Sequence, residues 1–355
     1  LRDIGEVRIA LEDGSSSVVN MGSSNSGVAI NPALDAPRRS PLAWILVAVL
    51  AVLFGGVLTM GISGRLGPAP EPPRLVHAQV GLPDRTTFYL NPAQPGPPIV
   101  SPDGRHLAFA GLDSTGRVML FVRSLDQQEA RSIPGTQGAG YPFWAPNSRE
   151  IGFFSDNDLN RVDIAGGPVV SVCVAENGKG GSWNTDDLIL FAPTHVASIH
   201  LVPAGGGDPV PVTTVDADSV ARSHRFPSWL PDGKHFIYLS WRNAEAARTT
   251  GNETVLRLGS IDGSTDRELL VSQTNGQFVD GHILHVHEAN LMARPFSIAS
   301  LEITGPPRPL LGGVLSLNAA HVGVFSASEA GLLGYVAGDG VFGLSRLTWF
   351  SRDGE

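Results

Sequence analysis

Short apolar segments alternate with turn residues along most of the chain. Each unit has a short apolar strand, a turn of Pro, Asp, Gly or Asn, and a second strand with apolar residues at alternate positions. Two clear copies read VSPDGRHLAFA and FWAPNSREIGFF. The six copies are centred on Pro102, Pro146, Thr185, Pro231, Asp280 and Ser328. Their intervals of 44, 39, 46, 49 and 48 residues match the period of a four-stranded propeller blade.

A second signal follows each copy at a similar offset and again alternates apolar with polar residues before it breaks on Gly, Asp or Ser. Such a pattern is typical of a third strand that enters a hairpin turn. The six copies begin at Leu120, Leu159, His200, Leu256, Leu291 and Leu347. Together the two signals predict an all-β, six-bladed β-propeller over residues 74–355. A two-sheet sandwich is the alternative, although a sandwich needs no fixed period.

The sixth unit ends directly after its third strand, so its fourth strand has to come from elsewhere. Circular closure hides the open edges of such a fold, and a strand distant in sequence can complete the last blade. The segment RLVHAQV, Arg74–Val80, precedes the first unit and alternates with period two. We predict that it pairs as the outer strand beside Leu347–Phe350.

The N-terminal part of the chain has a different pattern. Residues 42–63 form an uncharged apolar stretch of 22 residues, long enough as a helix to span a hydrocarbon core of about 30 Å. We expect a single transmembrane helix there; a signal peptide is the alternative, but its apolar run is usually shorter and closer to the start. Residues 13–40 are rich in Ser, Gly, Asn and Pro and predict a disordered juxtamembrane linker, and residues 64–73 a stiff Pro-rich spacer.

Composition narrows the class of protein. The 42 glycines and 27 prolines argue against a helical body, and the net charge of −9 argues against a nucleic-acid partner. Cys173 is the only cysteine, which excludes an intrachain disulfide and a cysteine-rich zinc site. The chain begins with Leu1 rather than Met, and we expect a longer parent protein that continues upstream.

The repeated segments resemble a known family. SPDGR, YPFWAPNS, GGSWN, SHRFPSWLPDG, LMARPF and LTWFSRDG are similar to the TolB-type, WD-like propeller of bacterial receptor serine/threonine kinases. In that family a cytoplasmic kinase domain precedes one transmembrane helix and an extracytoplasmic propeller, and residues 1–12 resemble the tail that follows the kinase. The resemblance implies a single-pass protein of the bacterial inner membrane, with the N-terminal side in the cytoplasm and further propeller sequence after Glu355.

The kinase motifs themselves do not occur in the chain. There is no Gly-rich phosphate loop, and HRF at His224 has Phe226 where a kinase catalytic loop has its aspartate. Neither a hydrolase nucleophile elbow nor an H-E-x-x-H zinc motif is present either. We therefore expect no enzymatic activity and no cofactor for this chain, while the parent protein is expected to be a serine/threonine protein kinase.

Two kinds of side chain are candidates for a binding site. Propellers carry function on loops at one face, and the loops that enter the inner strands should converge on the central channel. These loops contribute Tyr141, Lys179, His224, Arg225, Gln277 and His321 as candidate ligand- or partner-binding residues, although each also has an ordinary structural explanation. Trp144, Trp183 and Trp229 recur just before the turn, and this phase favours packing between blades over a ligand platform.

Metal binding has weaker support. His285 and His287 would share one face of a strand and are possible metal ligands, but no further ligand is identifiable, which favours a solvated strand face. The segment DNDLN at Asp156 opens like a calcium loop, yet it lacks the glycine and the closing glutamate and is interpreted as a hairpin turn.

Three functions are compatible with this organisation. The first is the membrane-anchored sensor or interaction module of a receptor kinase, which contacts the lipid bilayer through residues 42–63 and binds a protein, peptide or small-molecule ligand on the propeller. The second is a passive envelope scaffold that signals nothing. The third, an enzyme built on the segment from His282 to Glu288, lacks a complete set of ligands.

Overall fold

The computed structural model describes residues 77–80, 86–113, 115–215, 221–242, 244–251, 253–338 and 346–350. All of them belong to the compact unit Arg74–Glu355. The expected kinase tail, linker, membrane helix and spacer, residues 1–73, lie outside the described residues. Within the part of the chain that is described, no helix has the length and apolar character needed to cross a membrane.

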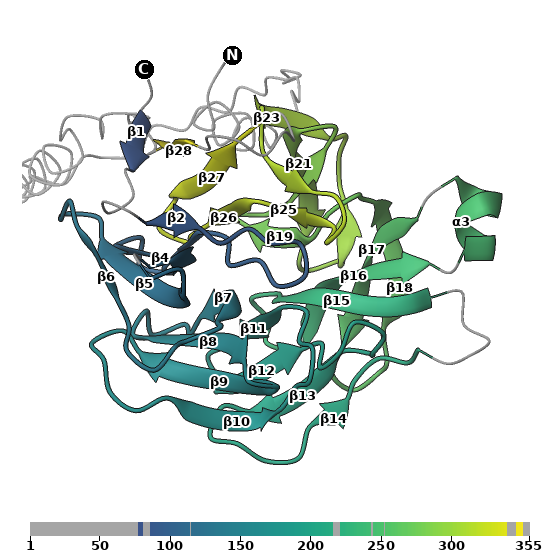
Figure 1. Ribbon diagram of the computed structural model, residues 1–355. Helices are drawn as coiled ribbons and strands as arrows, with labels where there is room; N and C mark the ends of the chain where they lie inside the picture. Colours follow the sequence, from purple (N-terminus) through teal and green to yellow (C-terminus); the bar gives the residue numbers. More distant parts are fainter. Residues whose placement is uncertain are drawn as a thin grey trace, which may run out of the picture. The chain divides into compact units, whose positions relative to one another are not determined.

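Five antiparallel sheets are each built from consecutive strands (Figure 1). The first contains β2 (Thr87–Phe88), β3 (Ile99–Val100), β4 (His106–Leu112), β5 (Val118–Ser124) and β6 (Ala130–Ser132). The second contains β7 (Gly140–Trp144), β8 (Glu150–Ser155), β9 (Asp158–Asp163) and β10 (Val170–Val174). The third contains β11 (Gly181–Trp183), β12 (Leu188–Phe191), β13 (His200–Pro203) and β14 (Val210–Pro211).

The fourth and fifth sheets carry additions to the four-stranded plan. The fourth contains β15 (Ala221–Trp229), β16 (His235–Arg242), β17 (Thr254–Ser260) and β18 (Asp266–Val271), with the helix α3 (Ala244–Thr250) between β16 and β17. The fifth contains β19 (Gly276–Val279), β20 (His282–His287), β21 (Asn290–Ser297), β22 (Glu302–Ile303) and β23 (Arg308–Gly312). A two-stranded sheet of β24 (Ser316–Leu317) and β25 (Val322–Gly323) follows.

The remaining four-stranded sheet is composite. Its order is β1-β28-β27-β26, in which β26 (Phe325–Ala327), β27 (Leu333–Ala337) and β28 (Arg346–Phe350) are joined by β1 (His77–Val80). His77 pairs with Phe350 and Val80 with Leu347, so the prediction that this segment becomes the outer strand is confirmed. The predicted count of six blades is corrected to five blades of consecutive strands; the sixth repeat forms a composite sheet with a strand from the other end of the domain.

The inner strands contact one another in a closed cycle. β3 contacts β7, and the cycle continues through β11, β15, β19 and β26 back to β3. Figure 1 shows the sheets following one another in chain order around these strands. The arrangement defines an all-β propeller and excludes the two-sheet sandwich. Large apolar side chains such as Tyr238, Phe109 and Phe153 are fully buried within and between the sheets.

The turns after the inner strands share one construction, in which a short polar side chain accepts hydrogen bonds from the backbone two or three residues later. Asp232 Oδ1 accepts from the N–H groups of Lys234 and His235, and Asn147 Oδ1 accepts from Arg149 and Glu150. This chemistry is the physical reason why Pro, Asp, Asn and Gly recur with the blade period.

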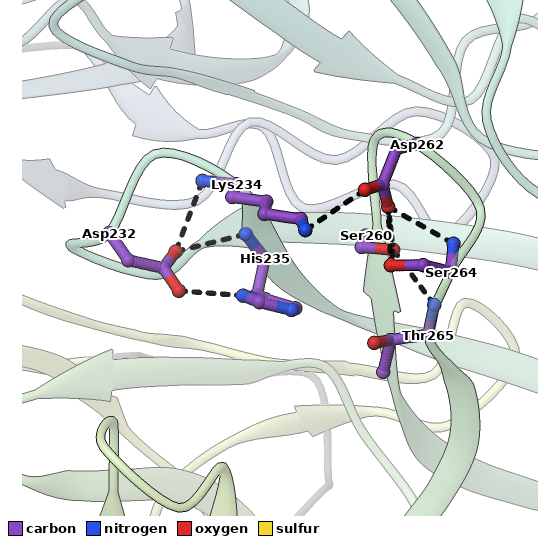
Figure 2. A network of polar contacts seen from close by, with 7 residues as sticks. All are labelled: Asp232, Lys234, His235, Ser260, Asp262, Ser264 and Thr265. Atoms are coloured by element: carbon purple, nitrogen blue, oxygen red, sulfur yellow. Dashed lines mark hydrogen bonds and ion pairs between the residues drawn. The ribbon is translucent and has the colours of Figure 1, made fainter.

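Two turns of the fourth blade are linked through a polar network (Figure 2). Lys234 Nζ lies 2.9 Å from Asp262 Oδ2, and the hydroxyls of Ser264 and Ser260 donate to the same carboxylate. These hydroxyl hydrogen bonds hold the pKa of Asp262 well below its ordinary value. The network is exposed, so it orders the turns more than it stabilises the fold.

Candidate functional site

The inner strands enclose a cavity of about 410 Å³. Strands β3, β7, β11, β15, β19, β25 and β26 all contribute to its lining, as expected for the central channel of a propeller. Most of the large side chains around it are aromatic: Tyr141, Phe143, Trp144, Trp183, Phe226, Trp229, Phe278 and Phe325. Polar residues such as Asn275, Gln277 and Glu329 also line it, and a concave cavity that combines aromatic with polar side chains can serve as a ligand site.

Tyr141 and Phe226 both line the cavity and pack against each other. Both residues lie in bulges of β7 and β15 and have positive φ angles of 47° and 51°. A bulge re-aims the side chain that it carries. The two ring centroids are 5.6 Å apart, although their strands are separated by β11. The aromatic pair therefore spans the space over the start of β11.

Gly180 makes this pairing possible because it precedes β11 and has no side chain. Its φ angle is +86°, and an added Cβ would lie 2.7 Å from Phe226 Cδ1. We expect Gly180→Ala to destabilise the domain by about 2–4 kcal/mol, through left-handed backbone strain and overlap with the ring. Urea unfolding measures the loss.

Gly116 provides the matched control for this substitution. Its φ angle is +80°, but nothing lies within 4 Å of an added Cβ. Gly116→Ala should cost only the backbone strain, about 1 kcal/mol. Equal losses in the two variants would contradict the steric role of Gly180.

Two buried cations lie beside the aromatic pair. Lys179 and Arg225 are only 6% and 5% exposed. The Lys179 ammonium lies 5.3 Å from the Tyr141 ring centroid and donates to the carbonyl oxygen of Ala93 at 2.7 Å. The Arg225 guanidinium stacks 4.5 Å from the Trp241 centroid. Contacts with aromatic faces stabilise both charges in part.

Arg225 is held from two further sides. Its Nε donates to Ser223 Oγ at 2.8 Å, and Nη2 donates to the carbonyl oxygen of His195 at 2.9 Å. Burial, and to a smaller extent the positive charge of Arg225, lowers the pKa of Lys179 to about 8. Among the described residues, neither cation forms an ion pair with a carboxylate. The Glu253 carboxylate acts instead on His321, where it opposes the lowering of the pKa of that ring by burial.

Four of the six predicted site residues come together here, because His321 joins Tyr141, Lys179 and Arg225. The centroid of the His321 ring lies 4.8 Å from that of Trp241. The guanidinium groups of Arg225 and Arg222 also contact the Trp241 ring. We call the cluster of Tyr141, Lys179, Arg225, Trp241 and His321 the channel mouth, although only Tyr141 among them lines the cavity itself.

The two other predicted residues have structural contacts. His224 lies next to Arg225 in β15, but its Nδ1 is 2.8 Å from Thr213 Oγ1 and its ring packs 4.7 Å from Tyr238. Gln277 lines the cavity, and its amide exchanges hydrogen bonds of 2.7 and 2.9 Å with the backbone of Ala327. These two hydrogen bonds between Gln277 and Ala327 join the inner strands β19 and β26.

Two parts of the channel mouth were not among the predicted site residues. Trp241 is the penultimate residue of β16, where it continues the alternation of Ile237 and Leu239 and carries no local signal of its role. Residues 89–98 reach the mouth through the Ala93 carbonyl and through Pro95, whose carbonyl accepts from Tyr141 N–H at 2.7 Å. Their prolines indicate a loop, but not its distant partners.

Two of the three blade tryptophans join neighbouring blades, as predicted, and all three also line the cavity. Trp144 Nε1 donates to the carbonyl of Ile99, and Trp229 Nε1 donates to the carbonyl of Ser182, both at 3.1 Å. Each bond joins an inner strand to that of the preceding blade. Trp183 instead donates to Asp187 within its own blade.

The two histidines considered as metal ligands differ in exposure. His285 is 5% exposed with its Nδ1 3.3 Å from Ser272 Oγ, whereas His287 is exposed. In the described part of the chain, no group of three or more His, Cys, Asp or Glu residues is placed to hold a metal ion. Asp156 and Asn157 form the two-residue turn between β8 and β9, so their interpretation as a hairpin turn is confirmed.

Cys173 lies on β10 and is partly buried. Burial, with a smaller effect from the negative charge of Asp158, raises the pKa of its thiol to about 11. The thiolate fraction at pH 8 is then about a hundredfold below that of an ordinary cysteine. We expect alkylation by iodoacetamide to be slower by a similar factor in the native chain than in urea. Equal rates in the two conditions would contradict this environment.

Comparisons with known proteins find similarity in fold only. No protein-family model matches the chain, and no curated protein matches it. A putative TolB from Agrobacterium tumefaciens is 18% identical, with 49% of this chain and 65% of that chain covered and a TM-score of 0.41. TolB from Acinetobacter baumannii is 14% identical, with 73% and 55% covered and a TM-score of 0.44. This chain therefore spans less than two thirds of either TolB.

A further similar structure is the PQQ-bound aldose sugar dehydrogenase from Streptomyces coelicolor. It is 12% identical, with 79% of this chain and 99% of that chain covered and a TM-score of 0.49. At these identities the likeness concerns fold alone, and the propeller assignment rests on the sheets and the cycle of inner strands described above.

Proposed function

We propose that the domain is a binding module that engages its ligand or partner at the channel mouth. The observation that supports this proposal best is the pair of buried cations, Lys179 and Arg225, beside aromatic side chains at one end of the cavity. Buried charges without a carboxylate partner cost free energy unless a bound group compensates them. Their hydrogen bonds to Ala93, Ser223 and His195 hold the two side chains in place but provide no negative charge.

The composite sheet is, in our proposal, the sixth blade. The cycle of contacts between inner strands includes β26, and β1 completes the outer edge of its sheet. Pairing the first strand with the last closes the ring and removes two exposed edges. A closed ring gives the channel mouth a rigid frame.

The setting of the module is the finer part of the proposal. Residues 42–63 would anchor it in the bacterial inner membrane with the propeller outside, and a kinase domain upstream would make it the sensor of a receptor. The apolar stretch and the motif resemblance support this setting. A passive envelope scaffold is the alternative.

The anchoring is tested with protease on intact spheroplasts. The propeller should be digested from outside, while an epitope fused before residue 1 stays protected until the membrane is lysed. Protection of the propeller, or its recovery in a soluble fraction, would refute the proposed orientation.

The sensor role is tested in the natural full-length protein with and without residues 77–350. Phosphate incorporation from ATP into the cytoplasmic part should respond to growth conditions only when the propeller is present. An identical response in both forms would favour the scaffold. If neither form incorporates phosphate, the kinase setting is wrong.

A further inference from the structure

We propose that the channel mouth binds an oxyanion, a carboxylate or phosphate group, between Lys179 and Arg225. The proposal rests on the binding function inferred above and assigns the chemical class of the ligand. It is carried by the arrangement of two cations, their unused donors and the aromatic side chains around them.

Counted over the described residues, both cations keep donors for such a group. An ammonium has three N–H bonds, of which Lys179 uses one for the Ala93 carbonyl. A guanidinium has five, of which Arg225 uses two, on Ser223 and on the His195 carbonyl. These existing bonds fix the two side chains in place. The remaining N–H groups can bind an oxyanion with charge-assisted hydrogen bonds.

Other largely buried arginines of the same chain show how charge is normally compensated. Arg242 pairs with Glu268 at 2.7 Å, Arg161 with Glu150 at 2.5 Å, and Arg257 with Asp266 at 2.9 Å.

Arg225 is less exposed than Arg161. The charges close to it include those of Arg222, which together with burial lowers the pKa of Arg225, and of Lys179, whose own pKa is lowered by burial and by Arg225. Two buried like charges repel each other, and an oxyanion between them would turn this repulsion into attraction.

The aromatic surroundings add shape to the site. Tyr141 lies under the Lys179 ammonium, and Trp241 lies against the Arg225 guanidinium. These faces exclude water from one side of each cation, so that a bound anion interacts at a lower effective dielectric than at the surface. A small organic carboxylate with an apolar body, or a phosphoryl group, has the matching chemistry.

The experiment is isothermal titration calorimetry on the full chain in detergent, at pH 7 and constant ionic strength. Sodium benzoate and inorganic phosphate are the two probes, and they distinguish a carboxylate from a phosphoryl ligand. At least one should bind saturably at a single site. Lys179→Met and Arg225→Gln should each weaken the binding at least tenfold.

Lys234→Met is the matched control, because Lys234 is the only other lysine and lies in an exposed turn. It should leave the affinity unchanged. Absence of saturable binding for both probes, or equal binding in all variants, would overturn the oxyanion proposal. The phosphate-incorporation test of the sensor role gives a separate answer. If that response depends on the propeller but neither probe binds, the oxyanion is wrong as the ligand class and the binding function still holds.

Thermal unfolding separates a ligand site from a purely structural lysine. If Lys179 only ties residues 89–98 through Ala93, then Lys179→Met should lower the melting temperature with or without anion. As a ligand site, the channel mouth should gain stability from the bound probe in the original chain but not in Lys179→Met. An equal effect of the probe on the melting temperatures of the two chains would contradict the proposal.

Discussion

Removal of residues 1–80 is expected to lower the melting temperature of the propeller by roughly 5–15 °C. The deletion takes away β1, whose four residues His77–Val80 pair with Leu347–Phe350 of β28. The outer edge of β28 then presents unpaired backbone groups, and the first and last strands no longer hold the ring closed. Loss of a few hydrogen bonds at about 1 kcal/mol each accounts for a shift of this size in a domain of this length.

A deletion of residues 1–72 is the control, because it removes the same N-terminal region but keeps β1. Scanning calorimetry should show little change for this shorter deletion. The longer deletion should also raise the tendency to aggregate, since an open strand edge pairs with other chains. Equal melting temperatures for the two chains would mean that the pairing of β1 with β28 contributes nothing to closure.

The repeat organisation was predictable from the sequence because each blade is marked locally. Asp103, Asn147 and Asp232 accept backbone hydrogen bonds in their turns, so the chemistry that builds the turn is also the chemistry that makes the repeat visible. The predicted third strands correspond to β5, β9, β13, β17, β21 and β28. The closing strand was predictable because the last unit lacked one.

The elements added to the four-stranded blades have no comparable pattern in the sequence. β2, β23, the β24–β25 pair and α3 do not repeat from blade to blade. Their positions depend on contacts distant in sequence, as when β2 pairs with Leu112 and Gly111 of β4. A repeat period reveals only the strands that recur in every blade, so these single insertions leave no trace in it.

In the candidate site, too, the residues marked by a local sequence pattern were predicted, and those placed by contacts distant in sequence were not. The loops that enter the inner strands were recognisable, and Tyr141, Lys179, Arg225 and His321 do gather there. Neighbours in a strand point to opposite faces, which separates His224 from Arg225 although the sequence pattern treats them alike. Trp241 joins the cluster through contacts across blades that no spacing along the chain encodes.

Two buried histidines are expected to make the stability of the propeller strongly dependent on pH between about 4 and 6.5. Burial lowers the pKa of His224 to about 4, and burial followed by the charges of His287 and Arg294 lowers the pKa of His285 to about 4. For His224, Asp266 opposes the shift and Arg257 adds to it. Both histidines are nearly inaccessible, with 2% and 5% exposure.

The direction follows from proton binding. In the unfolded chain a histidine takes up its proton near pH 6.5, whereas these two take it up only near pH 4 in the folded state. The unfolded state binds more protons between these values, so the free energy of unfolding falls as the pH falls through this window and is fully retained above it. The loss is about 3 kcal/mol for each histidine, or roughly 6 kcal/mol together.

Urea unfolding at pH 4.5, 5.5, 6.5 and 7.5 measures this dependence. The double variant His224→Asn, His285→Asn should start from a lower stability at pH 7.5, because the contacts with Thr213 and Ser272 change, but its stability should fall much less on acidification. His195→Gln is the control, since solvent reaches that ring. Aspartates with lowered pKa values, such as Asp113 at about 2, lose their contribution only below about pH 4. A pH profile that is equally steep in the double variant and the original chain would show that the two histidines do not control acid stability.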